Sequence, residues 1–192
     1  MELNKEYWEN RYEENEIGWD IGHVSTPIKE YVLQLKNKDI KILIPGAGNA
    51  HEAAFLHENG FTNVHILDIA KNPLDNFKEK HPTFPKKHII QSDLFQYENS
   101  FDLIIEQTFF CALNPELRVN YIEKMHDLLS KNGKIIGLLF NTFEEHTSPP
   151  FGGNKEEYLS LFNTHFSAVK MEKCYNSIKP RLGKELFFIA EK

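Results

Sequence analysis

Two glycines and an aspartate occupy positions in the sequence that are typical of nucleotide binding. Gly46 and Gly48 follow the apolar run at residues 40–44 and precede a helical pattern, where bare backbone lets a ligand group approach closely. Asp68 closes the next apolar run about 20 residues later, where its carboxylate can accept hydrogen bonds from ribose hydroxyls. Each feature has an ordinary alternative, a tight turn for the glycines and a helix N-cap for Asp68, but together they favour a nucleotide site.

A second acidic position follows the run at residues 88–91. Asp93 can accept a hydrogen bond from the exocyclic amine of adenine, and Leu94 can cover the ring. The alternative is a polar turn that closes a strand. Because strand-end loops bind the ligands of such sheets, Asp93 and Leu94 are candidate contacts of the same nucleotide.

Three aromatic residues, Trp8, Tyr12 and Trp19, stand in an otherwise polar N-terminal segment. Large aromatic side chains left in water are sticky, so we expect these rings to cover something. Aromatic faces attract cations and exclude water, which suits a methyl donor of the cationic sulfonium type. Core packing beneath the segment is the alternative for each ring.

The sequence at residues 106–111, EQTFFC, follows the fourth apolar run, where a transferred group should meet its acceptor. Here polar side chains give way to an apolar wall. Phe109 and Phe110 are expected to exclude water, and Cys111 to be a small buried side chain rather than a nucleophile.

The alternation of apolar runs and helical patterns predicts the fold class. Strands are expected at residues 40–44, 64–67, 88–91, 101–106 and 134–140. Helical patterns between most of them predict an α/β fold with a mostly parallel sheet. The last two runs, residues 168–175 and 185–190, flank a turn region with Pro180 and Gly183 and predict an antiparallel hairpin.

Length and composition limit the partners. The 192 residues fit one domain, residues 1–192, and we expect residues 1–37 to form a helical arm over the nucleotide site. The net charge of −6 argues against nucleic acid, and no run is long enough to cross a membrane, so we expect a cytoplasmic protein. We also expect a monomer. The histidines and the two cysteines lack the spacing of a metal site.

With these residues in view, the chain resembles the thiopurine S-methyltransferase superfamily, and within it the branch of thiol and halide methyltransferases. The resemblance runs nearly end to end. It rests on Tyr7-Trp8-Glu9 with Trp19-Asp20 and Thr26-Pro27, on ILIPGAGNAHEAAFL, on Leu67-Asp68-Ile69, and on FDLIIEQTFFCALNPELR with the downstream PPFGG.

The resemblance implies a Rossmann-like methyltransferase fold, with a seven-stranded sheet whose last strand is antiparallel and helices on both faces. It implies S-adenosylmethionine as cofactor and S-adenosylhomocysteine as product. Carried over by position, the cofactor contacts are Trp8, Tyr12, Trp19, Gly46, Asp68, Asp93, Leu94 and Gln107, beside Gly48 of the glycine loop. Phe109, Phe151 and Tyr158 are implied on the acceptor side.

One departure within the superfamily concerns the acceptor. Thiopurine-type members carry an arginine at the place of Gln107, whereas the thiol and halide branch has an uncharged residue there and a sequence like Phe109–Ala112. This favours a small-molecule acceptor that is a soft nucleophile: a thiol, hydrosulfide, thiocyanate or halide. An apolar pocket separates such acceptors by only a few kcal/mol, so the sequence does not name one.

The expected reaction is an in-line displacement at the sulfonium methyl group. A halide or preformed thiolate needs no general base, whereas a neutral thiol would benefit from one, for which Asp20, Glu106 and His146 are candidates. One alternative is a nicotinamide-dependent oxidoreductase, which the bulky His51 disfavours because a dinucleotide fingerprint wants glycine or alanine there. The others are a non-catalytic nucleotide-binding module and a methyltransferase with a macromolecular acceptor.

Overall fold

A computed structural model describes residues 2–142 and 147–192 as one seven-stranded sheet in the order β3-β2-β1-β4-β5-β7-β6. The strands are β1 (Ile42–Pro45), β2 (Val64–Asp68), β3 (Ile89–Gln91), β4 (Phe101–Gln107), β5 (Leu129–Phe140), β6 (Ala168–Lys173) and β7 (Glu185–Glu191). β1 and β2 are buried along their whole length, as expected of central parallel strands.

The C-terminal hairpin is antiparallel, as predicted. β7 pairs antiparallel with both β5 and β6, whereas β1 to β5 are joined by parallel pairs. The fifth strand begins earlier than the predicted residues 134–140. Leu129 follows the preceding helix directly and already pairs with Phe101, so Asn132 and Gly133 lie inside the strand.

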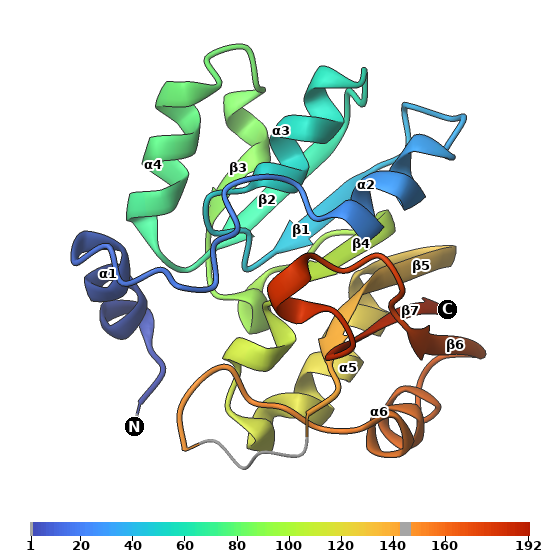
Figure 1. The fold of residues 1–192 in the computed structure, drawn as a ribbon. Helices are drawn as coiled ribbons and strands as arrows, with labels where there is room; N and C mark the ends of the chain where they lie inside the picture. Colours follow the sequence, from blue (N-terminus) through green and yellow to red (C-terminus); the bar gives the residue numbers. More distant parts are fainter. Residues whose placement is uncertain (1, 143–146) are drawn as a thin grey trace.

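Helices cover both faces of the sheet (Figure 1). They are α1 (Lys5–Glu13), α2 (Thr26–Leu33), α3 (His51–Glu58), α4 (Lys71–Lys80), α5 (Arg118–Leu128) and α6 (Lys155–Phe162), and short 3-10 turns join several elements. One core cluster packs α2, α3 and α4 on the sheet, and the other packs α5 and α6 on the opposite face. This two-faced packing is the predicted α/β arrangement.

The two N-terminal helices differ in their burial. α2 contributes Ile28 and Val32, both fully buried, to the core cluster it shares with α3. α1 has no buried residue and lies beside the start of α4, outside the two helical layers (Figure 1).

In the part of the chain that the structure describes, no helix is long and apolar enough to span a bilayer.

Candidate active site

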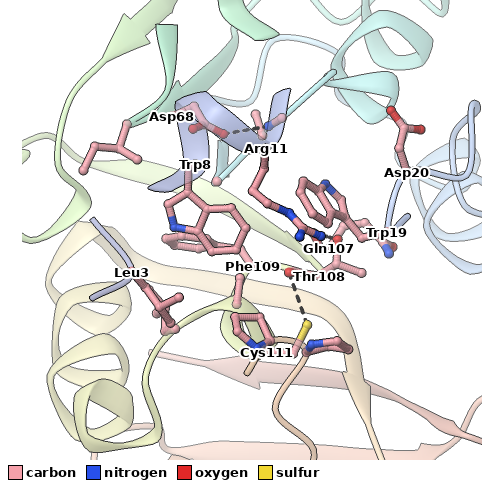
Figure 2. Close-up of a pocket in the computed structure, with 18 of the residues that line it drawn as sticks. Leu3, Trp8, Arg11, Trp19, Asp20, Asp68, Gln107, Thr108, Phe109 and Cys111 are labelled. Carbon is pink, nitrogen blue, oxygen red and sulfur yellow. Dashed lines mark hydrogen bonds between the residues drawn. The ribbon is translucent and has the colours of Figure 1, made fainter. Parts of the chain in front are cut away.

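A cavity of about 610 Å³ opens where β1, β2, β3 and β4 end, beneath α1 and the loop that follows it (Figure 2). The strand order reverses between β1 and β4, and ligands of open α/β sheets bind at such a reversal. The predicted cofactor residues all line this cavity: Trp8, Tyr12, Trp19, Gly46, Gly48, Asp68, Asp93, Leu94 and Gln107.

The glycine loop requires glycine for two reasons. Gly46 and Gly48 have φ angles of 56° and 52°, in the left-handed region that other residues rarely adopt. A Cβ atom at Gly46 would also collide with the Phe109 ring, and one at Gly48 would lie 2.5 Å from the Tyr12 hydroxyl oxygen. The loop therefore brings bare backbone against the cavity wall.

Asp68, at the end of β2, holds this loop in place. One carboxylate oxygen accepts the Gly48 N–H at 2.8 Å and the other accepts the Ala70 N–H at 2.9 Å. Burial raises the pKa of Asp68 to about 6, against the effect of these hydrogen bonds. A carboxylate has about four acceptor positions, so acceptor capacity remains for a hydroxyl donor.

Asp93 and Leu94 form the wall after β3. An Asp93 carboxylate oxygen caps a 3-10 turn by accepting the Phe95 N–H at 2.9 Å, and Leu94 is buried. The turn-closing role considered from the sequence is therefore present. It coexists with a place on the cavity wall, because both residues also line the cavity.

The three N-terminal aromatic residues form a roof over the strand ends. The Trp19 ring meets the Trp8 ring at 5.6 Å and the Tyr12 ring at 5.8 Å, both edge to face. Burial raises the pKa of Tyr12 far above its usual range. The rings thus pack on one another and also line the cavity, where Figure 2 shows Trp8 and Trp19, so their packing leaves them in place to cover a ligand.

Glu9 and Asp20 fasten the arm to the two neighbouring helices. The Glu9 carboxylate accepts the backbone N–H groups of Lys71 and Asn72 at 2.6 and 3.1 Å, which caps α4. Asp20 bonds the side chain of Asn49, and its Oδ1 lies 2.8 Å from His51 Nε2. The bulky His51 thus binds the arm at the start of α3.

The turn after β4 is built around a buried carboxylate. Glu106 is fully buried, and it accepts the N–H groups of Phe109 and Phe110 at 2.7 and 2.9 Å and the Tyr121 hydroxyl at 2.5 Å. Burial raises its pKa to about 7. Just beyond it, the Gln107 side chain accepts the Ser25 hydroxyl at 2.8 Å. Glu106 therefore positions the turn that presents Gln107 to the cavity.

Geometry separates the candidate general bases. Glu106 does not line the cavity, since its carboxylate faces the core. Asp20 lines it, but hydrogen bonds from His51, Asn49 and the Gly22 N–H outweigh the effect of burial and hold the pKa of Asp20 well below its usual range. His146 lies outside the described residues.

Within residues 2–142 and 147–192, no cluster of three or more potential metal ligands occurs.

The far end of the cavity is mostly apolar. Its wall includes Phe109, Cys111, Leu113, Phe140 and Pro150. Cys111 is buried, which raises the pKa of its thiol far above the usual range, so it is a packed side chain as expected.

Two residues implied on the acceptor side do not line the cavity. Tyr158 is 1% exposed in the core, where its ring packs edge-on against Phe110 and its hydroxyl donates to the Phe140 carbonyl at 2.9 Å. Phe151 donates its backbone N–H to the Cys111 carbonyl at 2.7 Å, and the preceding prolines line the wall instead. This corrects the expected placement of both side chains.

Two arginines at the cavity were not predicted. Arg11 of α1 places its guanidinium 5.5 Å from the Trp19 ring centroid. Arg181, just before β7, donates to the Trp19 carbonyl at 2.6 Å and stands over the Phe140 ring. The one signal for Arg11 in the sequence was its place between Trp8 and Tyr12. Arg181 ends a short 3-10 helix at residues 179–181, which no periodic pattern in the sequence predicts.

The cavity fits S-adenosylmethionine in its chemistry. The glycine loop provides a cradle that a Cβ atom would fill, and Asp68 retains acceptor capacity for ribose hydroxyls. The faces of Trp8, Tyr12 and Trp19 suit a sulfonium cation. When bound, the cofactor supplies a methyl group on positively charged sulfur.

Comparison with known proteins agrees with this site. The family model for thiopurine S-methyltransferase matches residues 3–190. The chain is 30% identical to thiocyanate methyltransferase 1 of Arabidopsis thaliana, over 93% of this chain and 81% of that protein. It is 29% identical to probable thiol methyltransferase 2 of the same plant, with the same coverage.

A solved structure shows the same fold at low sequence identity. The 1,6-didemethyltoxoflavin-N1-methyltransferase of Burkholderia thailandensis, bound to S-adenosylhomocysteine, superposes with a TM-score of 0.80 at 16% identity, covering 98% of this chain and 86% of that one. Because the family model spans nearly the whole chain, the protein belongs to the thiopurine S-methyltransferase family and is an S-adenosylmethionine-dependent S-methyltransferase.

Proposed function

We propose that the protein transfers the methyl group of S-adenosylmethionine to a small soft nucleophile: a thiol, hydrosulfide, thiocyanate or halide. The observation that carries this proposal is the junction of two surfaces in one cavity. The aromatic roof of Trp8, Tyr12 and Trp19 lies at the same cavity as the apolar wall that begins at Phe109. The names of the two plant relatives support the same class of acceptor.

The proposed contacts assign each part of the cofactor to residues at a different place in the cavity. Asp68 accepts from the ribose hydroxyls, and Asp93 with Leu94 binds the adenine ring. Gly46 and Gly48 leave room for the amino-acid portion. Trp8, Tyr12, Trp19 and Gln107 surround the sulfonium end.

The protein's own contribution is alignment and exclusion of water. Phe109, Cys111 and Leu113 keep the acceptor end dry, and a poorly hydrated anion is a stronger nucleophile. The roof fixes the approach along one line, and holding two reactants in line lowers the entropic part of the barrier. A preformed anion requires no general base, which agrees with the engaged carboxylates of Asp20 and Glu106.

The test combines binding and turnover in one preparation. Calorimetric titration with S-adenosylhomocysteine is followed by methyl transfer to hydrosulfide, thiocyanate and iodide, measured as volatile methylated product. We expect saturable binding and turnover with at least one of the three. Binding without turnover on any of the three would exclude them as acceptors and point to another acceptor or to the binding-only alternative, whereas absence of binding would contradict the donor site.

We further propose that the protein acts as a cytoplasmic monomer on a small molecule rather than on nucleic acid. The net charge of −6 supports the exclusion of nucleic acid, because a phosphate backbone repels an acidic protein. Light scattering coupled to gel filtration should give a mass close to 22.4 kDa. A mass of twice that value would contradict the monomer.

A further inference from the structure

Arg11 places a positive charge inside the cavity, where the donor itself is a cation. It lies in the last turn of α1 and lines the cavity together with Trp8 and Trp19. Figure 2 shows its side chain directed into the cavity beside both indole rings. The guanidinium carbon lies 5.5 Å from the Trp19 ring centroid, so this cation rests on an aromatic face.

The hydrogen-bonding capacity of Arg11 is only partly used. One terminal nitrogen donates to the Glu16 carboxylate at 2.8 Å, in a pair whose side chains are 35% and 54% exposed. The Arg11 Nε is buried and has no hydrogen-bond partner within residues 2–142 and 147–192. A guanidinium has five donor hydrogens, and a buried unpaired one costs free energy that a ligand can recover.

The position of Trp19 assigns Arg11 to the acceptor end. The Trp19 carbonyl is bound by Arg181, whose guanidinium stands over Phe140 at the end of β5. The carboxylates proposed for the nucleoside, Asp68 and Asp93, instead follow β2 and β3. A guanidinium attracts an anion, so an anionic acceptor is the ligand that the charge of Arg11 favours.

We propose that Arg11 is an acceptor-binding residue and that its guanidinium binds the acceptor in its anionic form. This inference rests on the proposed function and deepens it, because it excludes neutral thiols as the bound form. In the reaction, a lone pair of the anion forms the new bond to the methyl carbon. The donor's carbon–sulfur bond breaks and leaves its electron pair on sulfur, so two charges cancel and no proton is transferred.

The test measures anion binding directly in the complex with S-adenosylhomocysteine. The chain has two tryptophans, Trp8 and Trp19, and both line the cavity, so iodide bound there quenches the intrinsic fluorescence in a saturable way. Thiocyanate is titrated as a competitor of iodide. The variants are Arg11→Ala and Arg11→Lys, and Lys78→Ala is the control because it removes an exposed positive charge from α4, and Lys78 does not line the cavity.

We expect Arg11→Ala to raise the half-saturating iodide and thiocyanate concentrations about tenfold or more, Arg11→Lys to raise them less, and Lys78→Ala to leave them unchanged. Affinity for S-adenosylhomocysteine should stay within about twofold in every variant, since that product is uncharged at sulfur. Unchanged half-saturation in folded Arg11→Ala would overturn the assignment.

Methylthioadenosine, which lacks the amino-acid portion, separates Arg11 from the donor. If Arg11→Ala weakens S-adenosylhomocysteine but not methylthioadenosine, Arg11 binds the donor's carboxylate and the proposal fails. If the unmodified protein binds iodide saturably in an Arg11-dependent way but methylates none of the acceptors, the proposed function fails and the Arg11 anion site stands. Turnover without saturable anion binding would overturn the Arg11 site alone.

Discussion

The proposed donor end and the proposed acceptor end of the cavity are built in different ways. The donor end follows directly from β1, β2 and β3 and is tied by backbone hydrogen bonds, as in the Gly48 and Ala70 N–H groups that bind Asp68. The proposed acceptor end collects side chains from α1, the turn after β4, residues 149–150 and the segment before β7. The sheet thus sets the donor geometry, whereas side-chain packing sets the acceptor geometry.

This difference has a consequence for substitutions. A change at the donor end disturbs the loop between a central strand and its helix, so it alters cofactor binding and local structure together. A change at the acceptor end replaces one side chain of a wall whose members come from separate segments. Such changes should alter acceptor selectivity before they alter the fold.

The largest expected effect is the loss of Asp68. In Asp68→Ala the Gly48 and Ala70 N–H groups lose their buried acceptor and the ribose loses its partner. We expect the Kd of S-adenosylhomocysteine to rise about 100-fold by calorimetry, since two charge-assisted hydrogen bonds contribute about 3 kcal/mol. Asp75→Ala, an exposed change on α4, is the control. A loss below fivefold in a folded variant would contradict the donor role.

Trp19 lies between the proposed donor and acceptor ends of the cavity. Its replacement should distinguish two contributions to cofactor binding, the stabilisation of the sulfonium charge and the burial of surface. Trp19→Ala is expected to weaken S-adenosylmethionine about 20-fold, since aromatic faces stabilise cations by up to about 2 kcal/mol. The affinity for S-adenosylhomocysteine, which lacks the sulfonium charge, should fall less. Trp19→Phe should retain part of the stabilisation that distinguishes the two ligands. Equal losses for both ligands in a competition assay would mean that the ring only covers surface.

A pH titration tests the donor end without substitution. The pKa of Asp68 is raised to about 6 by burial, and the protonated acid offers fewer acceptor positions than the carboxylate. The Kd of S-adenosylhomocysteine should therefore be constant above pH 7 and about tenfold higher at pH 5. Asp68→Asn should remove this dependence. A Kd that stays constant from pH 7 to pH 5 would show that Asp68 titrates outside this range.

The same contrast explains what the sequence predicted. Gly46, Asp68 and Asp93 were identified because the ends of parallel strands meet at one edge, which turns a one-dimensional spacing into a place in the fold. The sheet and its C-terminal hairpin followed from the apolar runs in the same way. Arg11 and Arg181 reach the cavity through tertiary packing, which no local pattern records.

For Tyr158, the helical spacing of the sequence and the family resemblance predict different places. The spacing predicts a core residue, whereas the resemblance implies a residue on the acceptor side. It lies four residues before Phe162 on α6, so the two side chains share one face of the helix. Phe162 is fully buried in the core, and Tyr158 lies there beside it. The helical spacing alone therefore pointed to the core rather than to the acceptor.

The smallest expected effect tests that placement. Tyr158→Phe removes the hydrogen bond from the buried hydroxyl to the Phe140 carbonyl and keeps the ring, so the free energy of unfolding should fall by about 1 kcal/mol in urea denaturation. The KM for thiocyanate should stay unchanged because the side chain does not line the cavity. Tyr175→Phe is the matched control, since that ring is 83% exposed and its hydroxyl makes a long 3.4 Å contact with Glu30. If the KM rises while stability is kept, Tyr158 belongs to the acceptor wall, and the boundary drawn between the wall and the core must move to include α6.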